Sequence, residues 1–311
     1  IGGTMAPIEL EEGYDKDYVA AVNIASAPTG QLIPPSNTLI VYATVAGSVS
    51  VAALFMAGYI PGIAWGISLM FIAGYMAKKR GYVSTFSVTP KEALKVLWDA
   101  LPSLLLIIIV IGGILKGVFT ATEGSAIAVV YALILSLCYR SLKIKDLPSI
   151  ILSSCKTTCI VIFMIGVSSI MSWVMAYTMI PTAIANAMLS LSSNKYVILL
   201  LMNVILLVVG TFMDPTPAVL IFTPIFLPIC QSFGMDPVQF GIMIVFNLCI
   251  GTITPPVGVI LFTGCKVVGI SIEGVIKTLL PFFAAIAVVL LLVTYVPAMS
   301  MWIPSMLGLV K

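Results

Sequence analysis

The chain has 311 residues, of which 60% are hydrophobic and 9% are charged, and its formal net charge is +3. Soluble domains usually carry about 25% charged residues, so this composition excludes a water-soluble fold. The small positive charge gives no sign of a nucleic-acid partner, and six cysteines without any histidine indicate neither a zinc site nor a disulfide framework.

Apolar runs, most of them close to the about 20 residues that cross a bilayer, follow one another along the chain. Such continuous runs are helical, because barrel strands alternate apolar and polar residues. The sequence therefore predicts an all-α polytopic membrane protein. The predicted spans are 38–59, 60–76, 101–119, 126–137, 150–173, 197–212, 238–262 and 279–296.

The first notable segment reads GQLIPPSN and places Gly30 shortly before Pro34 and Pro35. Glycine frees the backbone and proline removes an N–H donor, so the segment predicts an interrupted helix. Ser26, Ser36 and Asn37 flank the interruption. Their side chains either bind substrate or recap the helix ends, and the sequence does not decide between these two roles.

Basic residues gather at the ends of two predicted spans that are two passes apart, so both clusters are expected on one face. By the positive-inside tendency this face is cytoplasmic. Between the clusters, residues 90–100 predict an amphipathic helix at the membrane interface, with a plain connector as the alternative. Glu123 is expected to cap a helix rather than to form a site. The clusters are Lys78, Lys79 and Arg80, and Arg140, Lys143 and Lys145.

A second polar position within apolar sequence is Asp214, in GTFMDPTPAVLIFTPIFLPI. The surrounding prolines predict a helical hairpin that dips into the membrane, with Asp214 at its tip. An ionisable residue at that depth indicates function, so Asp214 is a candidate ligand for a cation or for a substrate hydroxyl. The alternative is that Asp214 caps the next helix in an aqueous loop.

The segment GTITPP interrupts the run 238–262 at residues 251–256. Two successive prolines remove two backbone donors and leave carbonyls unpaired at membrane depth, where each would cost several kcal/mol if exposed to lipid. Carbonyls of an unwound helix together with the hydroxyls of Thr252 and Thr254 suit Na⁺. A simple proline kink is the alternative interpretation.

The two interruptions belong to an internal repeat with a constant offset of 221 positions, as in 255 − 34 = 221. Matching breaks in two halves of a chain are a sequence sign of a transporter binding site. The first unit is then expected to begin about 130 residues before Ile1, and its topology is inverted if an odd number of spans separates the units. The matched pairs are Pro7 and Pro228, Gly13 and Gly234, Asp15 and Asp236, Gly30 and Gly251, Pro34 and Pro255, and Pro35 and Pro256.

The stretches IPPSNTLIVYA, FMAGYIPGI, GVFTATEGSAIAVVYAL, GMDPVQFGIM and GTITPPVGVILF, with the Asp214 segment, resemble the large membrane subunit of tripartite ATP-independent periplasmic (TRAP) transporters. The resemblance implies a bacterial inner-membrane protein, not an enzyme, that takes up sialic acid, a sugar acid or a C4-dicarboxylate with Na⁺. It also implies a periplasmic substrate-binding protein and a small four-helix membrane subunit, separate or fused upstream, as partners within the lipid membrane. The permease subunit of an ATP-driven importer remains the alternative.

The resemblance further implies an inverted-repeat elevator with a scaffold and a transport domain. Its Na⁺ ligands would come from Gly210, Asp214, Thr216, Gly251, Thr252 and Thr254, with Gly30 at a second site, and its substrate ligands from Ser26, Ser36, Asn37 and Asp214. The implied map is 1–36 for the end of a first hairpin region and a first unwound helix, 37–89 for helices that complete the first repeat, and 90–100 for the interfacial helix. It continues with 101–209 for scaffold and transport helices, 210–236 for a re-entrant hairpin, 237–275 for a second unwound helix and 276–311 for a C-terminal scaffold helix.

Overall fold

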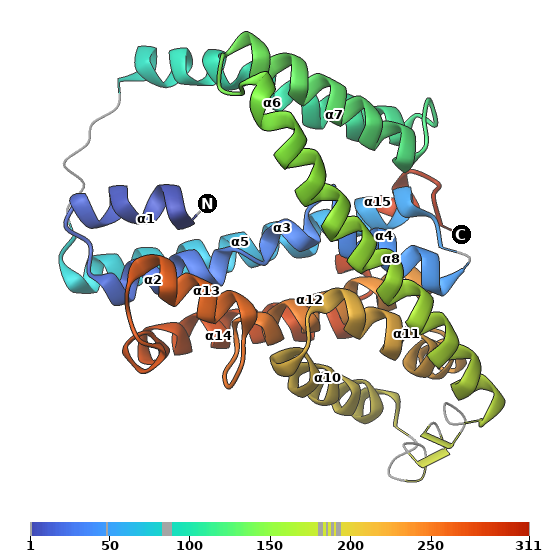
Figure 1. Cartoon of the computed structure of the whole chain (residues 1–311). Helices are drawn as coiled ribbons and strands as arrows, with labels where there is room; N and C mark the ends of the chain where they lie inside the picture. The colour runs from blue at the N-terminus through green and yellow to red at the C-terminus, as the bar shows by residue number, and fades with distance from the viewer. Residues whose placement is uncertain are drawn as a thin grey trace. The chain divides into compact units, whose positions relative to one another are not determined.

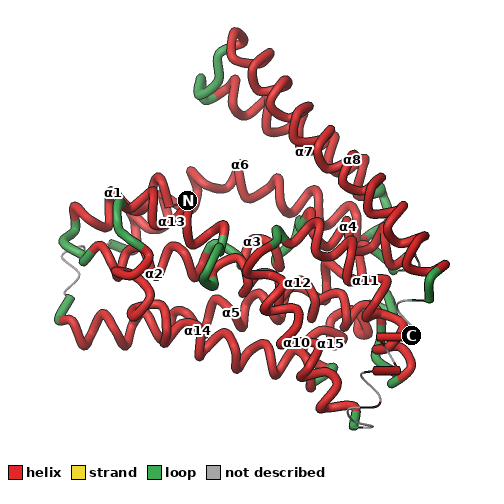
Figure 2. The backbone as a smooth tube through the Cα atoms, turned by 60° about the horizontal axis from the view of Figure 1, so that its bottom comes forward, coloured by secondary structure: helices red, strands yellow, loops and turns green. Residues whose placement is uncertain are grey.

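The computed structural model describes residues 2–47, 49–82, 89–179, 183–184, 186–187, 190 and 194–310. In these residues all regular structure is helical, as Figure 2 shows. Among the described residues, six helices are long and apolar enough to cross a membrane. Two compact units form: a first unit of Ile1–Tyr82 and Ile165–Lys311, and a second unit of Val83–Met164. Within the predicted segments 37–89 and 101–209, residues 83–88 and most of 180–193 lie outside the described residues.

The N-terminal half of the first unit contains a helix interrupted at its middle. The helix that follows the interruption ends before Gly47, whose φ of +74° is not helical. Ser50 then caps the next helix by accepting a hydrogen bond from Ala53 N. The predicted division at 59/60 is therefore wrong: the boundary lies at 47–50, and Pro61 lies inside one long helix. The helices are α1 (Gly2–Glu11), α2 (Lys16–Ser26), α3 (Thr29–Leu32), α4 (Asn37–Ala46) and α5 (Val51–Arg80).

The C-terminal half of the first unit contains the second interrupted helix, and the single predicted run 238–262 is two helices. The predicted hairpin 210–236 leaves out most of its first helix, which has 18 residues and starts at Lys195. Residues 276–311 lie in the unit that carries both interruptions, and their assignment to a scaffold stays a prediction. The helices are α10 (Lys195–Phe212), α11 (Pro215–Ser232), α12 (Pro237–Ile253), α13 (Val259–Val268), α14 (Ile272–Tyr295) and α15 (Ala298–Met306).

The second unit contains α6 (Pro90–Leu115), α7 (Ala121–Cys138), the short 3₁₀ helix η1 (Ile144–Asp146) and the start of α8 (Leu147–Tyr177). Residues 90–100 are no separate interfacial helix but the first turns of α6, which continues through Pro102. A capping box of Thr89 and Glu92 starts α6. Glu123 forms the same motif at the start of α7, which confirms it as a cap, with Thr120 as its partner.

The two halves of the first unit repeat the same local structure at the predicted offset. Asp15 and Asp236 precede α2 and α12, and Gly13 and Gly234 before them both have positive φ, at +89° and +74°. Both Pro–Pro bonds in the interruptions are cis. The similarity continues beyond the residues matched in the sequence, because α5 begins at Val51 and α14 at Ile272, again 221 positions apart (272 − 51 = 221).

The packing of these helices is also reciprocal. Helix α11 packs against α12 of its own half and α4 of the other half, and α1 packs against α2 of its own half and α13 of the other. Figures 1 and 2 both show α2, α3 and α4 running in the direction opposite to α12 and α13. These contacts of α1 and α11 are therefore exchanged with one another when the two halves are exchanged.

Candidate functional site

The second interruption follows directly from the chemistry of Pro255 and Pro256. Neither residue has an N–H, so the carbonyls of Gly251 and Thr252 lose the donors that a continuous helix would provide four residues later. The Gly251 carbonyl accepts from Thr254 N instead, at 3.0 Å. The Thr252 carbonyl has no backbone donor among the described residues, although Thr252 is only 2% exposed. Among the described residues, this carbonyl oxygen of a buried residue is therefore left without a backbone partner.

The end of α10 lies directly against this interruption. A Cβ on Gly251 would be 2.3 Å from the carbonyl carbon of Gly210, so only glycine allows the two backbones to approach this closely. Gly258 N, just beyond the prolines, donates to the carbonyl of Thr211 at 3.1 Å. The structure thus brings Gly210 against Gly251, next to Thr252, and a role of these three residues in binding an ion stays a prediction.

Asp214 lies in the two-residue connection between α10 and α11. Its side chain is the N-cap of α11 and accepts from Thr216 N at 3.1 Å, and the residue is exposed. The capping alternative therefore describes the observed contact. A cation or substrate role for Asp214 and Thr216 stays a prediction, since the carboxylate has no hydrogen bond to Thr252 or Thr254 among the described residues.

The first interruption contains Gly30, which is exposed and would accept a Cβ without contact. Ser36 caps α4 by accepting from Leu39 N at 3.3 Å, which is the recapping role expected as one of two. Asn37 is the exposed first residue of α4. Behind the interruption α5 approaches closely, since a Cβ on Gly58 would lie 2.3 Å from the carbonyl oxygen of Leu32.

A contact that sequence reasoning missed joins the two interruptions. The Sγ of Cys249, two residues before Gly251, lies 3.1 Å from Oε1 of Gln31, directly after Gly30. Cys249 is fully buried and Gln31 is half-buried. The only signal in the sequence was an amide side chain inside the first break.

The hydroxyl groups around both interruptions share one hydrogen-bonding pattern. Each donates its proton to a backbone carbonyl nearby in the chain, so its remaining lone pairs can only accept or coordinate. The pairs are Ser26 to Asn23 (3.2 Å), Thr29 to Ser26 (2.6 Å), Ser36 to Gln31, Thr211 to Val208 (2.7 Å), Thr252 to Cys249 (2.7 Å) and Thr254 to Ile250 (2.7 Å).

A buried amide cluster, also missed from the sequence, lies beside the second interruption. Asn247 Nδ2 donates to Asn203 Oδ1 at 2.7 Å, and Asn203 Nδ2 donates to Thr294 Oγ1 at 3.0 Å. The three residues are at most 2% exposed and come from α12, α10 and α14. Asn203 is seven residues before Gly210 and Asn247 four residues before Gly251, so the cluster lies on the faces through which α10 and α12 meet.

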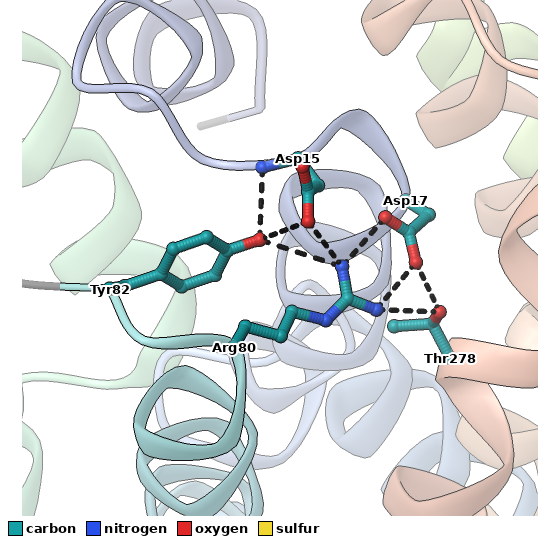
Figure 3. A network of polar contacts seen from close by, with 5 residues as sticks. All are labelled: Asp15, Asp17, Arg80, Tyr82 and Thr278. Carbon is teal, nitrogen blue, oxygen red and sulfur yellow. Dashed lines mark hydrogen bonds and ion pairs between the residues drawn. The ribbon is translucent and has the colours of Figure 1, made fainter.

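Arg80 is the centre of a polar network that fastens the ends of three helices (Figure 3). Its guanidinium binds both carboxylate oxygens of Asp17 at 2.8 and 2.6 Å and one oxygen of Asp15 at 3.0 Å. Thr278 of α14 donates to Asp17, and Tyr82 donates to Asp15 at 2.6 Å. The hydrogen bonds from Arg80, helped by Thr278, lower the pKa of Asp17 to about 2 against the opposing effect of burial. Sequence reasoning had counted Arg80 only as part of a basic cluster.

Comparison with known proteins gives one family over almost the whole chain. The family described as "Tripartite ATP-independent periplasmic transporter, DctM component" matches residues 1–299. The chain is 52% identical to the uncharacterized protein YgiK of Salmonella typhimurium, covering 98% of the chain and 70% of that protein. It is 35% identical to the sialic acid TRAP transporter large permease protein SiaM of Vibrio cholerae, covering 94% and 69%. It is 40% identical to the isethionate TRAP transporter permease protein DctMQ of Oleidesulfovibrio alaskensis, covering 97% of the chain and about half, 48%, of that protein.

Proposed function

Because the chain belongs to the DctM component family of tripartite ATP-independent periplasmic transporters, we propose that it moves a small organic anion inward together with Na⁺. The family is one of multi-pass transporters of the bacterial inner membrane, so the chain is a transporter and not an enzyme. Because the family is ATP-independent, the alternative function as the permease subunit of an ATP-driven importer is not supported.

The observation that supports Na⁺ most directly is the oxygen-rich junction between α10 and the second interruption. Unwound carbonyls and hydroxyl lone pairs are the ligands that coordinate Na⁺ in transporters with broken helices. The Thr252 carbonyl and the hydroxyl oxygens of Thr211, Thr252 and Thr254 are all of this kind. We assign the proposed ion to the region of Gly210, Asp214, Thr216, Gly251, Thr252 and Thr254, and a second ion to the first interruption at Gly30.

The proposed substrate class rests on the relatives and on the first interruption. Relatives are named for isethionate, sialic acid and C4-dicarboxylate, all of which are organic anions. The N-terminus of α4, with Ser36 and Asn37, carries the positive end of a helix dipole into the interruption, where an anion is favoured. Ser26 and Asp214 complete the proposed substrate ligands.

The proposed mechanism is an elevator in which the first unit is the transport domain and the second unit belongs to the scaffold. The first unit carries both interruptions and the reciprocal packing of an inverted repeat, so it would move as one body with its ions and substrate. A periplasmic binding protein would deliver the substrate. The small four-helix membrane subunit would complete the scaffold, as a separate or a fused chain.

The test is uptake into proteoliposomes that contain the transporter, its small subunit and its binding protein. We expect uptake to require an inward Na⁺ gradient and to continue without ATP, and Thr252→Ala to weaken the Na⁺ response while the protein remains monodisperse. Uptake that is the same with and without the Na⁺ gradient would contradict the proposal.

A further inference from the structure

We propose that Gln31 is a substrate-binding residue whose amide Nε2 donates a hydrogen bond to the anionic group of the substrate, and that Cys249 positions this amide. The proposal rests on the proposed function and names the donor that the anion would meet. It concerns a carboxylate or sulfonate group, which accepts hydrogen bonds and donates none when ionised.

The first step is that the hydroxyls around the two interruptions already have backbone acceptors, so each would have to give up that hydrogen bond to donate to an anion. Those of Ser26, Thr29, Ser36, Thr211, Thr252 and Thr254 already donate to backbone carbonyls, which leaves only their lone pairs for further contacts. Lone pairs attract a cation and repel an anion. A donor without an acceptor in the structure is therefore better placed to bind the anion than these hydroxyls are.

The second step is the orientation of the Gln31 amide. Its Oε1 faces the Cys249 thiol at 3.1 Å, and this contact uses the acceptor end of the amide. The donor end, Nε2, has no hydrogen-bond partner among the described residues, and the side chain is only half-buried. An amide that is held by its oxygen presents its N–H groups in a fixed direction.

The third step is the position of Gln31 in the fold. The contact with Cys249 joins one interruption to the other across 218 positions of the chain, so it lies at the interface between the two halves. Substrate sites of transporters with inverted repeats lie at this interface, between the discontinuous helices. Two contacts fix the backbone of the first interruption. Ser36 donates to the Gln31 carbonyl, and α5 packs directly against the Leu32 carbonyl because Gly58 has no side chain.

A neutral donor also suits an anion that travels with Na⁺. Hydrogen bonds from neutral amides to an ionised group are stronger than bonds between neutral groups. They leave no uncompensated positive charge in the membrane when the substrate departs, whereas a buried arginine or lysine would.

The experiment is uptake into the proteoliposomes described above of succinate, N-acetylneuraminate or isethionate, whichever the wild-type transporter accepts. We expect Gln31→Leu to raise KM by roughly 10- to 100-fold, the effect of losing one hydrogen bond to a charged group. Gln31→Glu should raise KM further by repulsion. Cys249→Ser keeps a donor and should change KM by less than about threefold, whereas Cys249→Ala should raise it by roughly threefold to tenfold.

Two further readouts separate substrate binding from a merely structural contact. The Na⁺ concentration for half-maximal uptake should stay within about twofold in Gln31→Leu, and the matched control Gln231→Leu, an exposed glutamine on α11, should leave KM unchanged. A lower melting temperature with an unchanged KM in Gln31→Leu would overturn the proposal. Wild-type uptake that ignores Na⁺ would contradict the coupling in the proposed function, while the comparison of KM values would still decide the role of Gln31.

Discussion

Gly210 and Gly251 allow α10 and α12 to meet backbone to backbone beside the second interruption. We expect Gly251→Ala to lower the free energy of unfolding by about 1–3 kcal/mol or more, because its Cβ would collide with the Gly210 backbone at 2.3 Å, and backbone cannot give way as a flexible side chain can. Unfolding of the purified transporter in nanodiscs measures the effect. Gly66→Ala in α5, where a Cβ meets nothing within 4 Å, is the matched control and should leave stability unchanged or raise it by up to about 1 kcal/mol.

The network around Arg80 predicts a pH dependence with a definite sign. Asp17 has its pKa lowered to about 2 from 3.8, so the stabilisation from its charged form is complete above the unfolded value and is lost as the pH falls from about 4 towards 2. We expect Asp17→Asn to lower the melting temperature by a constant amount between about pH 5 and 8, and by less below about pH 4. Asp146→Asn, at an exposed aspartate of η1, serves as the control. A difference between wild type and Asp17→Asn that grew in acid would contradict this assignment.

At the scale of elements, the interruption between α12 and α13 exists because residues 255 and 256 lack N–H groups. Pro255→Ala combined with Pro256→Ala restores both donors, and we expect the carbonyls of Gly251 and Thr252 to become paired in a more continuous helix. The Na⁺ concentration for half-maximal thermal stabilisation should then rise by roughly tenfold or more. Pro281→Ala, at an exposed proline within α14, should leave it unchanged. An unchanged Na⁺ concentration for half-maximal stabilisation in the double variant would show that these carbonyls are not ligands of the proposed ion.

The packing of α10 on α12 and α14 depends on the buried cluster of Asn203, Asn247 and Thr294. A buried polar group that loses its partner keeps its desolvation cost, so single substitutions in a connected cluster are not additive. We expect a double-mutant cycle of Asn203→Ala and Thr294→Val to give an interaction energy of about 0.5–3 kcal/mol. A cycle of Asn203→Ala with Thr44→Val, on α4, should be additive to within about 0.5 kcal/mol. Additivity in the first cycle would show that the 3.0 Å contact does not stabilise the helix packing.

At the scale of the whole molecule, two helices of spanning length, α6 and α7, separate the end of α5 from the loop after α7. An even number of crossings returns the chain to the same face, so Lys79 and Lys143 should both be cytoplasmic. Cysteines introduced at these exposed positions, with Cys138, Cys155 and Cys159 replaced by serine, should react with a membrane-impermeant maleimide only from the cytoplasmic side. Labelling of the two positions from opposite sides would contradict this topology.

Errors in the predicted elements arose where one local signal outweighed another. The polar residues of 90–100 suggested a separate interfacial helix, yet the capping box at Thr89 starts a helix that continues for 26 residues. The apolar run 38–59 gave no sign of its interruption, because Gly47 and Ser50 act through backbone conformation and a cap rather than through hydropathy. Asp214 caps α11 in the structure, and its cation or substrate role stays a prediction.

The sequence by itself determined that the chain lies in a membrane, that two helices are interrupted and that the interruptions repeat at 221 positions. These properties depend on composition and on the missing N–H of proline, which act within a few residues. Only the tertiary structure decided which distant groups meet: Arg80 with Asp17 across 63 positions, Gln31 with Cys249 across 218, and Gly210 against Gly251. Each of these residues has several possible partners in the sequence. The packing of the helices selects one of them, because it decides which groups lie within reach of each other.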